Sequence, residues 1–218
     1  MLRLDINGSP IYDIFYNGDR ISQVFYNGES IYRAGAYPPH TVLLNEAVAG
    51  TYEFHFKKGR HFISLTGAGG RASGGYYYAC FCNSGGSGGS IIGDFYITDE
   101  CDAVITVGAG KSGKGNPSQL TIGNALVMYA DGGNYCHANG SCSGNTGGAD
   151  NVFNPTEQLQ DINIQLVTGN RGAYSTGTAQ GAYSNDAIDT TRGRGATSNS
   201  CNVVIGKAGG VYIEYISG

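Results

Sequence analysis

The chain has 218 residues, enough for one sizeable domain or for one domain and a small module, and 40% of them are apolar. Only 14% are charged and the formal net charge is −4, so the composition shows no basic footprint and we expect no nucleic-acid or anionic-membrane partner. No apolar run approaches the roughly 18 residues that would indicate a membrane-spanning helix.

The first 35 residues contain a ten-residue repeat in which Asn-Gly follows a short β-type run, at Asn7-Gly8, Asn17-Gly18 and Asn27-Gly28. Asn-Gly is the strongest short hairpin signal, because both residues tolerate the positive φ angles of a type I′ turn. The repeat therefore predicts a small β-meander over residues 1–36. A meander of this size buries little surface by itself. Docking on the main domain, on a copy of itself or on another protein all stay open.

Tyr37-Pro38-Pro39 ends this module, because Pro-Pro favours a stiff, extended polyproline-II linker. The second predicted domain spans residues 37–218. In its first strand, Tyr52, Phe54 and Phe56 alternate with polar residues, so we expect these rings on one buried face. No run shows the 3.6-residue period of a helix. The expected strands are Thr51–Lys57, Arg60–Thr66, Ser90–Thr98, Ala103–Val107, Gln119–Ile122, Ala125–Ala130, Ile162–Val167, Asn202–Ile205 and Val211–Ile216.

Glycine is concentrated between the expected strands, since 31 of the 37 glycines follow Leu65. Glycine loses more entropy on folding than any other residue, so such a chain needs a structural use for it. One use is to pack extended polyproline-II segments side by side, where the missing side chain lets backbones approach and hydrogen-bond. The predicted fold class is thus all-β: a β-sandwich with glycine-rich, polyproline-II-like connections, preceded by the meander of Asn-Gly hairpins.

The six cysteines allow fifteen disulfide pairings. The N-terminus lacks the apolar core of a secretory signal, which favours synthesis in a reducing cytoplasm and free thiols. Two groups, Cys80-x-Cys82 and Cys136-His137-x4-Cys142, carry thiolate and imidazole ligands for zinc, but their spacings fit no standard zinc site. We therefore predict no bound metal and no cofactor.

Enzyme motifs are weak in this chain. The run Gly108-Ala-Gly110-Lys111-Ser112-Gly113 partly matches phosphate-binding loops, which require a helix immediately after them, and Gly115-Asn116-Pro117 follows instead. No G-x-S-x-G elbow is present. Carboxylates are scattered, and glycosidase chemistry would need two at a fixed separation. The sequence predicts a protein without enzymatic activity.

Aromatic residues in the glycine-rich tracts are the stronger signal. Tyrosine combines a large contact area, a polar tip and little rotamer entropy, and tyrosine among Gly, Ser and Asn is the composition of an antibody-like binding loop. Single rings of this kind also pack on a sandwich, so it is the set that indicates binding. The candidate receptor-binding residues are Tyr76, Tyr77, Tyr78, Phe81, Tyr135, His137, Tyr174 and Tyr183.

Five segments in order resemble the glycine-rich domains of bacteriophage tail and tail-fibre proteins: Gly50-Thr-Tyr-Glu-Phe-His-Phe56, His61-Phe-Ile-Ser-Leu-Thr-Gly-Ala-Gly-Gly70, Ala103-Val-Ile-Thr-Val-Gly-Ala-Gly110, Leu126-Val-Met-Tyr-Ala-Asp-Gly-Gly133 and Gly206-Lys-Ala-Gly-Gly-Val-Tyr-Ile-Glu-Tyr215. The Tyr-Asn-Gly repeat likewise resembles segments of phage tail proteins. The resemblance implies a β-sandwich with a polyproline-II layer and receptor-contacting loops at its distal end. A similar glycine-rich fold occurs in the ectodomain of anaplastic lymphoma kinase, so the fold alone does not fix the function.

The function expected from this resemblance is that of a non-enzymatic phage tail-tip adhesin, made in the host bacterial cytoplasm and carried on the virion. Its partners would be a bacterial surface glycan or outer-membrane protein and, through residues 1–35, other tail proteins; homo-oligomerisation stays open. The alternatives are a tail-associated polysaccharide depolymerase and a structural tail-assembly protein without receptor contact.

Overall fold

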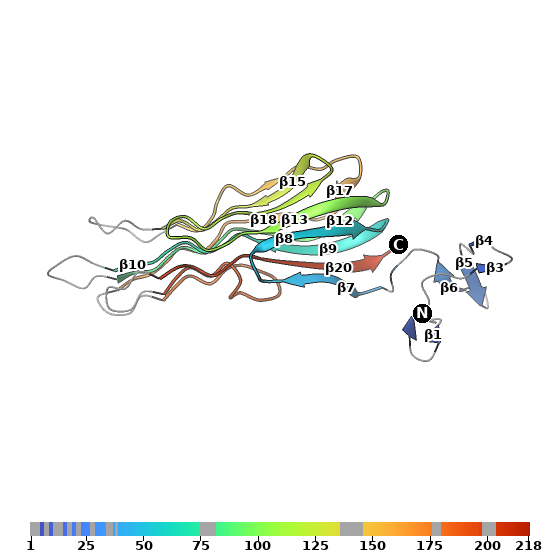
Figure 1. Ribbon diagram of the computed structural model, residues 1–218, viewed down its shortest axis with the longest axis horizontal. Coiled ribbons are helices and arrows are strands. Elements are labelled where there is room, and N and C mark those ends of the chain that lie inside the picture. The colour runs from blue at the N-terminus through green and yellow to red at the C-terminus, as the bar shows by residue number, and fades with distance from the viewer. Residues whose placement is uncertain are drawn as a thin grey trace.

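The computed structural model of the chain describes residues 37, 39–74, 82–135, 146–175, 180–197 and 204–218, and within residues 5–33 the backbone of six short strands. For residues 73–74, 82–83 and 174–175 it likewise describes the backbone alone. These parts of the chain form twenty β-strands and no helix (Figure 1), so the prediction of an all-β protein is confirmed.

The larger of two main antiparallel sheets has the strand order β17-β12-β9-β20-β7, and β18 pairs with β12 beside β17. The last strand of the chain therefore lies between two of the first strands of the domain. Register is continuous between β9 and β12, where Ser90 pairs with Thr66 and Ile97 pairs with Gly59. The strands are β7 (Thr41–Glu46), β9 (Gly59–Thr66), β12 (Ser90–Ile97), β17 (Leu159–Asp161), β18 (Gln165–Val167) and β20 (Gly210–Ser217).

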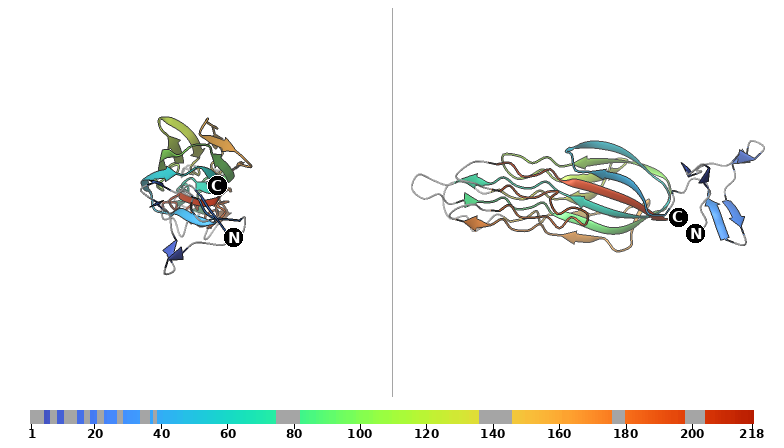
Figure 2. Two further views of the ribbon diagram at one scale, coloured as in Figure 1. Left: turned by 90° about the vertical axis from the view of Figure 1, so that its right-hand side faces the viewer. Right: turned by 90° about the horizontal axis from the view of Figure 1, so that it is seen from below.

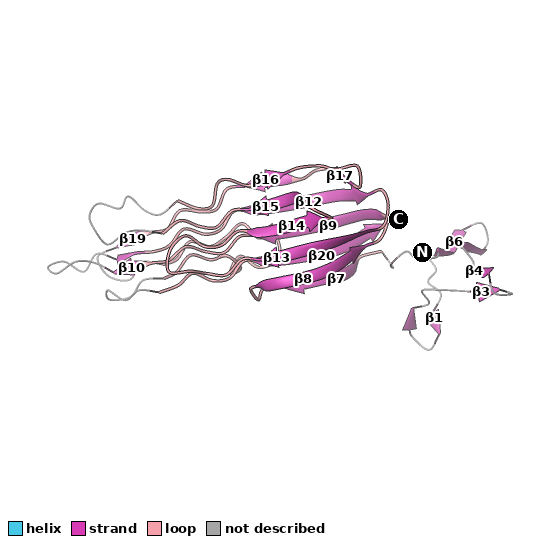
Figure 3. Ribbon diagram, turned by 45° about the horizontal axis from the view of Figure 1, so that its top comes forward, coloured by secondary structure: helices cyan, strands magenta, loops and turns pink. Residues whose placement is uncertain are grey.

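The second sheet has the order β16-β15-β14-β13-β8 and is also antiparallel. In β8 the rings of Tyr52, Phe54 and Phe56 are the less exposed set and the residues between them are exposed, as the alternation predicted. Figure 3 shows the two sheets as layers at the same end of the elongated domain. The strands are β8 (Gly50–Phe56), β13 (Cys101–Val107), β14 (Ser118–Ile122), β15 (Ala125–Ala130) and β16 (Val152–Phe153).

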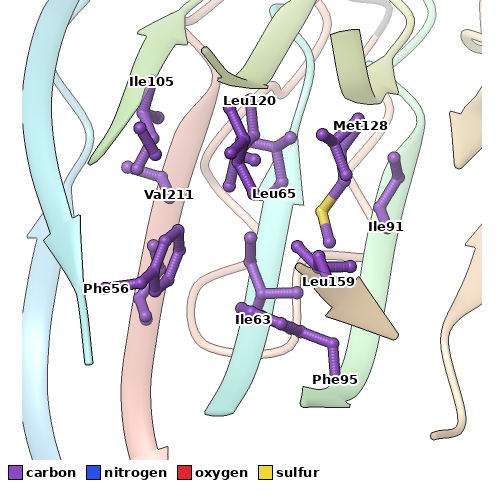
Figure 4. Close-up of a cluster of buried hydrophobic side chains, with 14 of the residues drawn as sticks. Phe56, Ile63, Leu65, Ile91, Phe95, Ile105, Leu120, Met128, Leu159 and Val211 are labelled. Atoms are coloured by element: carbon purple, nitrogen blue, oxygen red, sulfur yellow. The ribbon is translucent and has the colours of Figure 1, made fainter. Parts of the chain in front are cut away.

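The hydrophobic core lies between these sheets (Figure 4). Ile63 and Phe95 come from the first sheet, and Leu120 and Met128 come from the second, all fully buried. Phe56 bridges the layers, with its ring centroid 5.5 Å from that of Phe95 in an edge-to-face arrangement. Burial of each such side chain contributes roughly 1.5–3 kcal/mol, so this core stabilises the end of the domain that carries the sheets.

Seven of the nine expected strands are present with ends within two residues of the prediction. Of the expected strand Ile162–Val167, only the last three residues form a strand, β18, and β17 ends just before this range. Gly93 has φ +143° and a Cβ on it would meet Asn163, while the N–H groups of Ile162 and Asn163 both donate to the Asp94 carbonyl at 3.1 and 3.2 Å. This local distortion interrupts the ladder.

Two further differences concern β7 and the segment before β20. The strand β7 (Thr41–Glu46) is not among the expected strands, because its exposed and buried residues do not alternate simply. The interruption lies where the pairing of β7 with β20 shifts register between Ile213 and Glu214. Of the expected strand Asn202–Ile205, the first two residues lie outside the described part. Val204 forms only an isolated bridge to Ala72, and the described residue after it is not in a strand.

Beyond the sheets, the connections between strands run as extended segments that pack side by side (Figure 2, right). We call each of these segments a pass. We call the passes together the glycine-rich layer and define it as residues 67–72, 84–89, 108–116, 131–134, 146–151, 168–173, 180–185, 192–197 and 204–209. Its far end, which we call the distal end, carries a small three-stranded sheet in the order β10-β11-β19. These strands are β10 (Ser73–Gly74), β11 (Cys82–Asn83) and β19 (Tyr174–Ser175).

Backbone hydrogen bonds tie these passes together with a period of three. Along 67–72, N–H groups three residues apart donate to the same neighbour, at N···O distances between 2.9 and 3.1 Å. Residues 67 and 70 donate to 84–89, residues 68 and 71 to 113–116, and residues 69 and 72 to 204–207. Three residues per turn without internal hydrogen bonds is the geometry of a polyproline-II helix, so the pattern supports the expected type of connection.

The pass 84–89 repeats the same pattern with other neighbours. Residues 84 and 87 donate to 168–173, residues 85 and 88 to 193–196, and residues 86 and 89 to 131–134, at 2.8 to 3.2 Å. It also accepts from Gly148 and Ala182. Each of these two central passes is thus surrounded by others, and nearly every inward N–H has a backbone partner, which satisfies buried amides without a sheet.

Glycine is required where these passes touch. A Cβ on Gly85 would lie 1.9 Å from the Gly70 carbonyl oxygen, and one on Gly132 would lie 1.8 Å from that of Gly115. Both contacts are with backbone, which cannot move aside as a flexible side chain can. The clusters of glycine in the sequence are therefore a steric condition for the layer.

Six short strands precede the domain as three hairpins. The strands are β1 (Asp5–Ile6), β2 (Ser9–Pro10), β3 (Phe15–Tyr16), β4 (Asp19–Arg20), β5 (Gln23–Tyr26) and β6 (Glu29–Arg33). Each antiparallel pair is separated by one of the Asn-Gly dipeptides. The expectation of one continuous meander is wrong in this respect: among the described strands these form three separate two-stranded sheets, because each pairs only across its own turn.

Candidate functional site

The distal end gathers the ends of four segments that lie outside the described residues: 75–81, 136–145, 176–179 and 198–203. The residues next to the first and third of them pair in one sheet, Gly74 with Cys82 and Cys82 with Ser175. Asn134 N donates to the Thr146 carbonyl at 3.1 Å, across the second segment. The four segments therefore begin and end at the same end of the glycine-rich layer.

The ends of the fourth segment are tied to the same passes. Gly181 N donates to Thr197 Oγ1 at 3.1 Å, and Ala72 N donates to the Val204 carbonyl at 3.0 Å. Only the segment 75–81 contains tyrosine, the other three consist mostly of small and polar residues, and none of the four contains Asp, Glu, Lys or Arg. The candidate residues Tyr76, Tyr77, Tyr78, Phe81 and His137 fall in these segments, outside the described part of the chain.

Tyr183 is the predicted site residue with the clearest surroundings. Its side chain is 49% exposed, and the guanidinium carbon of Arg194 lies 4.0 Å from its ring centroid in a cation–π contact. Arg194 is held in place by two further bonds, Nε to the Gly181 carbonyl at 3.3 Å and Nη2 to Gln180 Oε1 at 3.0 Å. The ring is therefore fixed by neighbours and still open to a ligand.

Amide side chains complete the surroundings of this ring. Asn170 Nδ2 donates to the Tyr183 carbonyl at 2.8 Å and to Asn185 Oδ1 at 3.1 Å. The two asparagines are thus hydrogen-bonded to each other and to the backbone of Tyr183. An aromatic face beside planar amide and guanidinium groups suits a ligand that offers C–H faces and hydroxyls.

Tyr135 and Tyr174 each follow directly after a pass of the layer, 131–134 and 168–173. Tyr135 is half-buried, and its ring lies within van der Waals distance of the position where a Cβ on Gly113 would be. Tyr174 is in β19, paired with Asn83 at the distal end. The passes that carry Tyr135 and Tyr183 contact different sides of 84–89, so the structure does not bring these two tyrosines into one patch.

Sequence reasoning missed Arg194, Gln180 and Asn170, which build the surroundings of Tyr183. The sequence indicated Tyr183 because tyrosine among small polar residues is typical of binding loops. Asn170 and Arg194 lie on other passes, more than ten positions away, and Gln180 lies on the same pass as Tyr183. No local pattern connects residues that only the packing of the layer brings together.

Another group of polar side chains lies on the outer face of the second sheet. His55 Nδ1 is 2.6 Å from Asp102 Oδ1, and Lys57 Nζ donates to Glu100 Oε2 at 3.1 Å. Lys57 lowers the pKa of the Glu100 carboxyl, with a smaller contribution from His55. The group is exposed to solvent.

Cys101 lies between these acids in sequence and faces the other way. Strand alternation places its thiol on the inner face, where it is buried and free. Burial raises the pKa of the thiol and the charge of Asp102 raises it further. His55 and Cys101 therefore do not form a nucleophile and base pair.

The structure shows no phosphate site at the glycine-rich run 108–113 and no metal site among the described residues. Residues 108–113 lead into a turn and then β14, so no helix N-terminus faces Gly108-Ala-Gly110, as a phosphate site would require. Among the described residues no group of three His, Cys, Asp or Glu is arranged to hold a metal ion. Cys80, Cys136 and Cys142 lie outside that part of the chain.

Within the described residues, no helix has the length and apolar character needed to cross a membrane. Neither a protein-family model nor a curated protein matches this chain.

Proposed function

We propose that the chain is a non-enzymatic bacteriophage tail-tip adhesin that binds a receptor on the bacterial cell surface. The observation that carries the proposal is the common origin of four segments, 75–81, 136–145, 176–179 and 198–203, at the distal end of the glycine-rich layer. Their composition is that of binding loops, in which tyrosine and small polar residues supply contact area and hydrogen bonds.

The layer supports this proposal through its rigidity. Its passes are bonded backbone to backbone, and glycines at the contacts leave no space for a side chain. Segments that begin and end on such a support lose less freedom when they bind, which favours affinity. The N-terminal hairpins would attach the protein to other tail proteins by pairing of their exposed strand edges.

Binding without catalysis distinguishes this function from that of a depolymerase. We would label purified full-length protein with a fluorophore and measure its binding to the bacterial host of the virus that carries the gene. We would also measure the chain length of the host's surface polysaccharide by size-exclusion chromatography. The proposal predicts labelled cells, unchanged chain length and slower adsorption of the virus when the protein is in excess. Shortened polysaccharide, or unlabelled cells with normal adsorption of the virus, would contradict it.

A further inference from the structure

The charges of this chain are distributed unevenly, although the net charge is −4. The glycine-rich layer has seven basic residues and two acidic ones, Asp131 and Asp150. The acidic residues are concentrated in the other part of the domain, which has three basic residues and eleven acidic ones. This part consists of the two main sheets with their turns and the turn 186–191, which bonds to Thr66 and Ser64 of β9. The basic residues of the layer are Arg71, Lys111, Lys114, Arg171, Arg192, Arg194 and Lys207.

Four of these basic residues lie on adjacent passes and form what we call the cationic stripe: Arg71, Lys111, Arg194 and Lys207. Lys207 N donates to the Arg194 carbonyl at 2.9 Å, which places the two residues side by side. Arg71 N and Nη1 donate to the Gly113 and Ser112 carbonyls at 3.1 and 2.9 Å. The loop that carries Lys111 therefore lies against Arg71.

The pass 204–209 joins the two halves of the cationic stripe. Gly69 N donates to the Lys207 carbonyl at 2.9 Å, and Ala72 N donates to that of Val204 at 3.0 Å. On its other side, the Gly206 carbonyl oxygen is so close to Gly110 that a Cβ there would lie 2.0 Å from it. The four residues thus lie on neighbouring segments that backbone hydrogen bonds and close glycine contacts join.

These cations are available to a ligand. Lys111 and Lys207 are exposed, and Arg71 and Arg194 are half-buried. Within the described residues, none of the four forms an ion pair with a carboxylate. The buried acid of the layer, Asp131, is already paired with Lys114 at 2.8 Å. The cationic stripe therefore has no internal countercharge.

We propose that the cationic stripe binds an anionic surface polysaccharide, one that carries carboxylate or phosphate groups along its chain. This proposal rests on the proposed adhesin function and names its ligand class. The open ring of Tyr183 and the amide of Gln180, both in contact with Arg194, suit sugar rings and hydroxyls as well as charge. The excess of acidic residues on the sheets repels a long polyanion along the rest of the molecule, so the ligand contacts only the glycine-rich layer.

The test measures binding of full-length protein to immobilised polymers by biolayer interferometry. The probes are polygalacturonate for carboxylate, polyribitol phosphate for phosphate, neutral dextran, and duplex DNA. The double substitution Lys111→Gln/Lys207→Gln removes two exposed cations of the cationic stripe. The matched control, Lys57→Gln/Lys58→Gln, makes the same change in net charge beside the sheets. Thermal melts check that both variants fold.

The expected result is salt-sensitive binding to one or both anionic polysaccharides and none to dextran. Two weak surface contacts together are worth roughly a tenfold change in affinity, so Lys111→Gln/Lys207→Gln should bind about tenfold more weakly. The control should bind as the wild type does. Equal losses in both variants, or tighter binding to DNA than to either polysaccharide, would overturn the proposal.

The same variants separate this inference from the adhesin function. If host cells are labelled equally by wild type and by Lys111→Gln/Lys207→Gln, and the anionic polymers are not bound, the cationic stripe is not the ligand site and the adhesin function stands. If wild-type protein binds the anionic polymers but labels no host cells, the adhesin function fails while the polyanion site remains.

Discussion

At the scale of single residues, the glycine-rich layer depends on the absence of a Cβ atom at its glycines. A Cβ at many positions of the layer would fall within about 2 Å of a carbonyl oxygen on the next pass. The clustering of glycine between the expected strands predicted that extended segments pack closely there. The sequence could not indicate Arg194 beside Tyr183, because that contact depends on which pass neighbours which, and hydrogen bonds between distant segments set that order.

Substitution of a contact glycine should therefore destabilise the layer strongly. In Gly85→Ala the new methyl group would lie 1.9 Å from the Gly70 carbonyl oxygen, and we expect a loss of about 3 kcal/mol or more in the free energy of unfolding. The control is Gly113→Ala in the same layer, where the nearest atom is a Tyr135 ring carbon at 3.8 Å. Urea unfolding measures both. Similar stabilities for the two variants would show that the passes are not in tight contact.

A buried histidine should make the protein sensitive to acid. His61 is fully buried among Phe56, Phe95 and Tyr215, and its Nδ1 donates to the Gly59 carbonyl at 3.0 Å. Burial lowers its pKa from 6.5 to about 4, partly offset by that hydrogen bond.

The unfolded chain therefore takes up the His61 proton first as the pH falls. The neutral His61 therefore stabilises the folded state fully above pH 6.5, and this contribution is lost as the pH falls from 6.5 to 4. The free energy of unfolding decreases by at most about 3 kcal/mol through this residue. His61→Phe keeps the ring and removes the proton. Its unfolding free energy should fall less between pH 7 and pH 4 than that of the wild type, in urea titrations at each pH. Parallel pH dependence would mean that His61 is protonated in the folded state.

At the scale of elements, periodicity predicted strands where a buried face alternates with an exposed one. The strands β12, β13, β14 and β20 follow that rule over most of their length, and they were placed within two residues. The edge strands were harder to predict. In β7 a register shift opposite Ile213 breaks the alternation. Beside β12, where Gly93 has a positive φ, only the last three residues of the expected strand Ile162–Val167 form a strand, β18. An edge strand pairs with only one neighbouring strand, so a local distortion of this kind determines where the strand begins and ends.

The Asn-Gly hairpins should be separable from the rest of the chain. Their described strands pair only across their own turns, whereas the core lies between the two main sheets. Deletion of residues 1–35 should leave the melting temperature of the main domain nearly unchanged and abolish incorporation into virions. Differential scanning calorimetry and immunoblots of purified particles measure the two effects. Truncated protein on intact virions would contradict an attachment role for the hairpins.

At the scale of the whole molecule, the hydrophobic core lies between the two main sheets at one end, and the proposed binding segments begin and end at the other. Sheets and core lie together (Figure 3), and the glycine-rich layer extends from them to the distal end. The sequence predicted the all-β class of these sheets, and receptor binding by the candidate tyrosines stays a prediction. The sequence did not reveal the separation of charge, because basic residues that are spread over 137 positions between Arg71 and Lys207 become neighbours only when the passes pack.

The central claim is that the distal end binds a receptor while the rest of the chain holds it. The most direct test is host-cell binding by a variant with serine at Tyr77, Tyr135, Tyr174 and Tyr183, measured by flow cytometry beside its melting temperature. We predict loss of cell binding, since a few aromatic contacts usually carry 2 kcal/mol or more each, at a nearly unchanged melting temperature. Wild-type cell binding by this folded variant would contradict the account, because the receptor site would then lie away from these tyrosines.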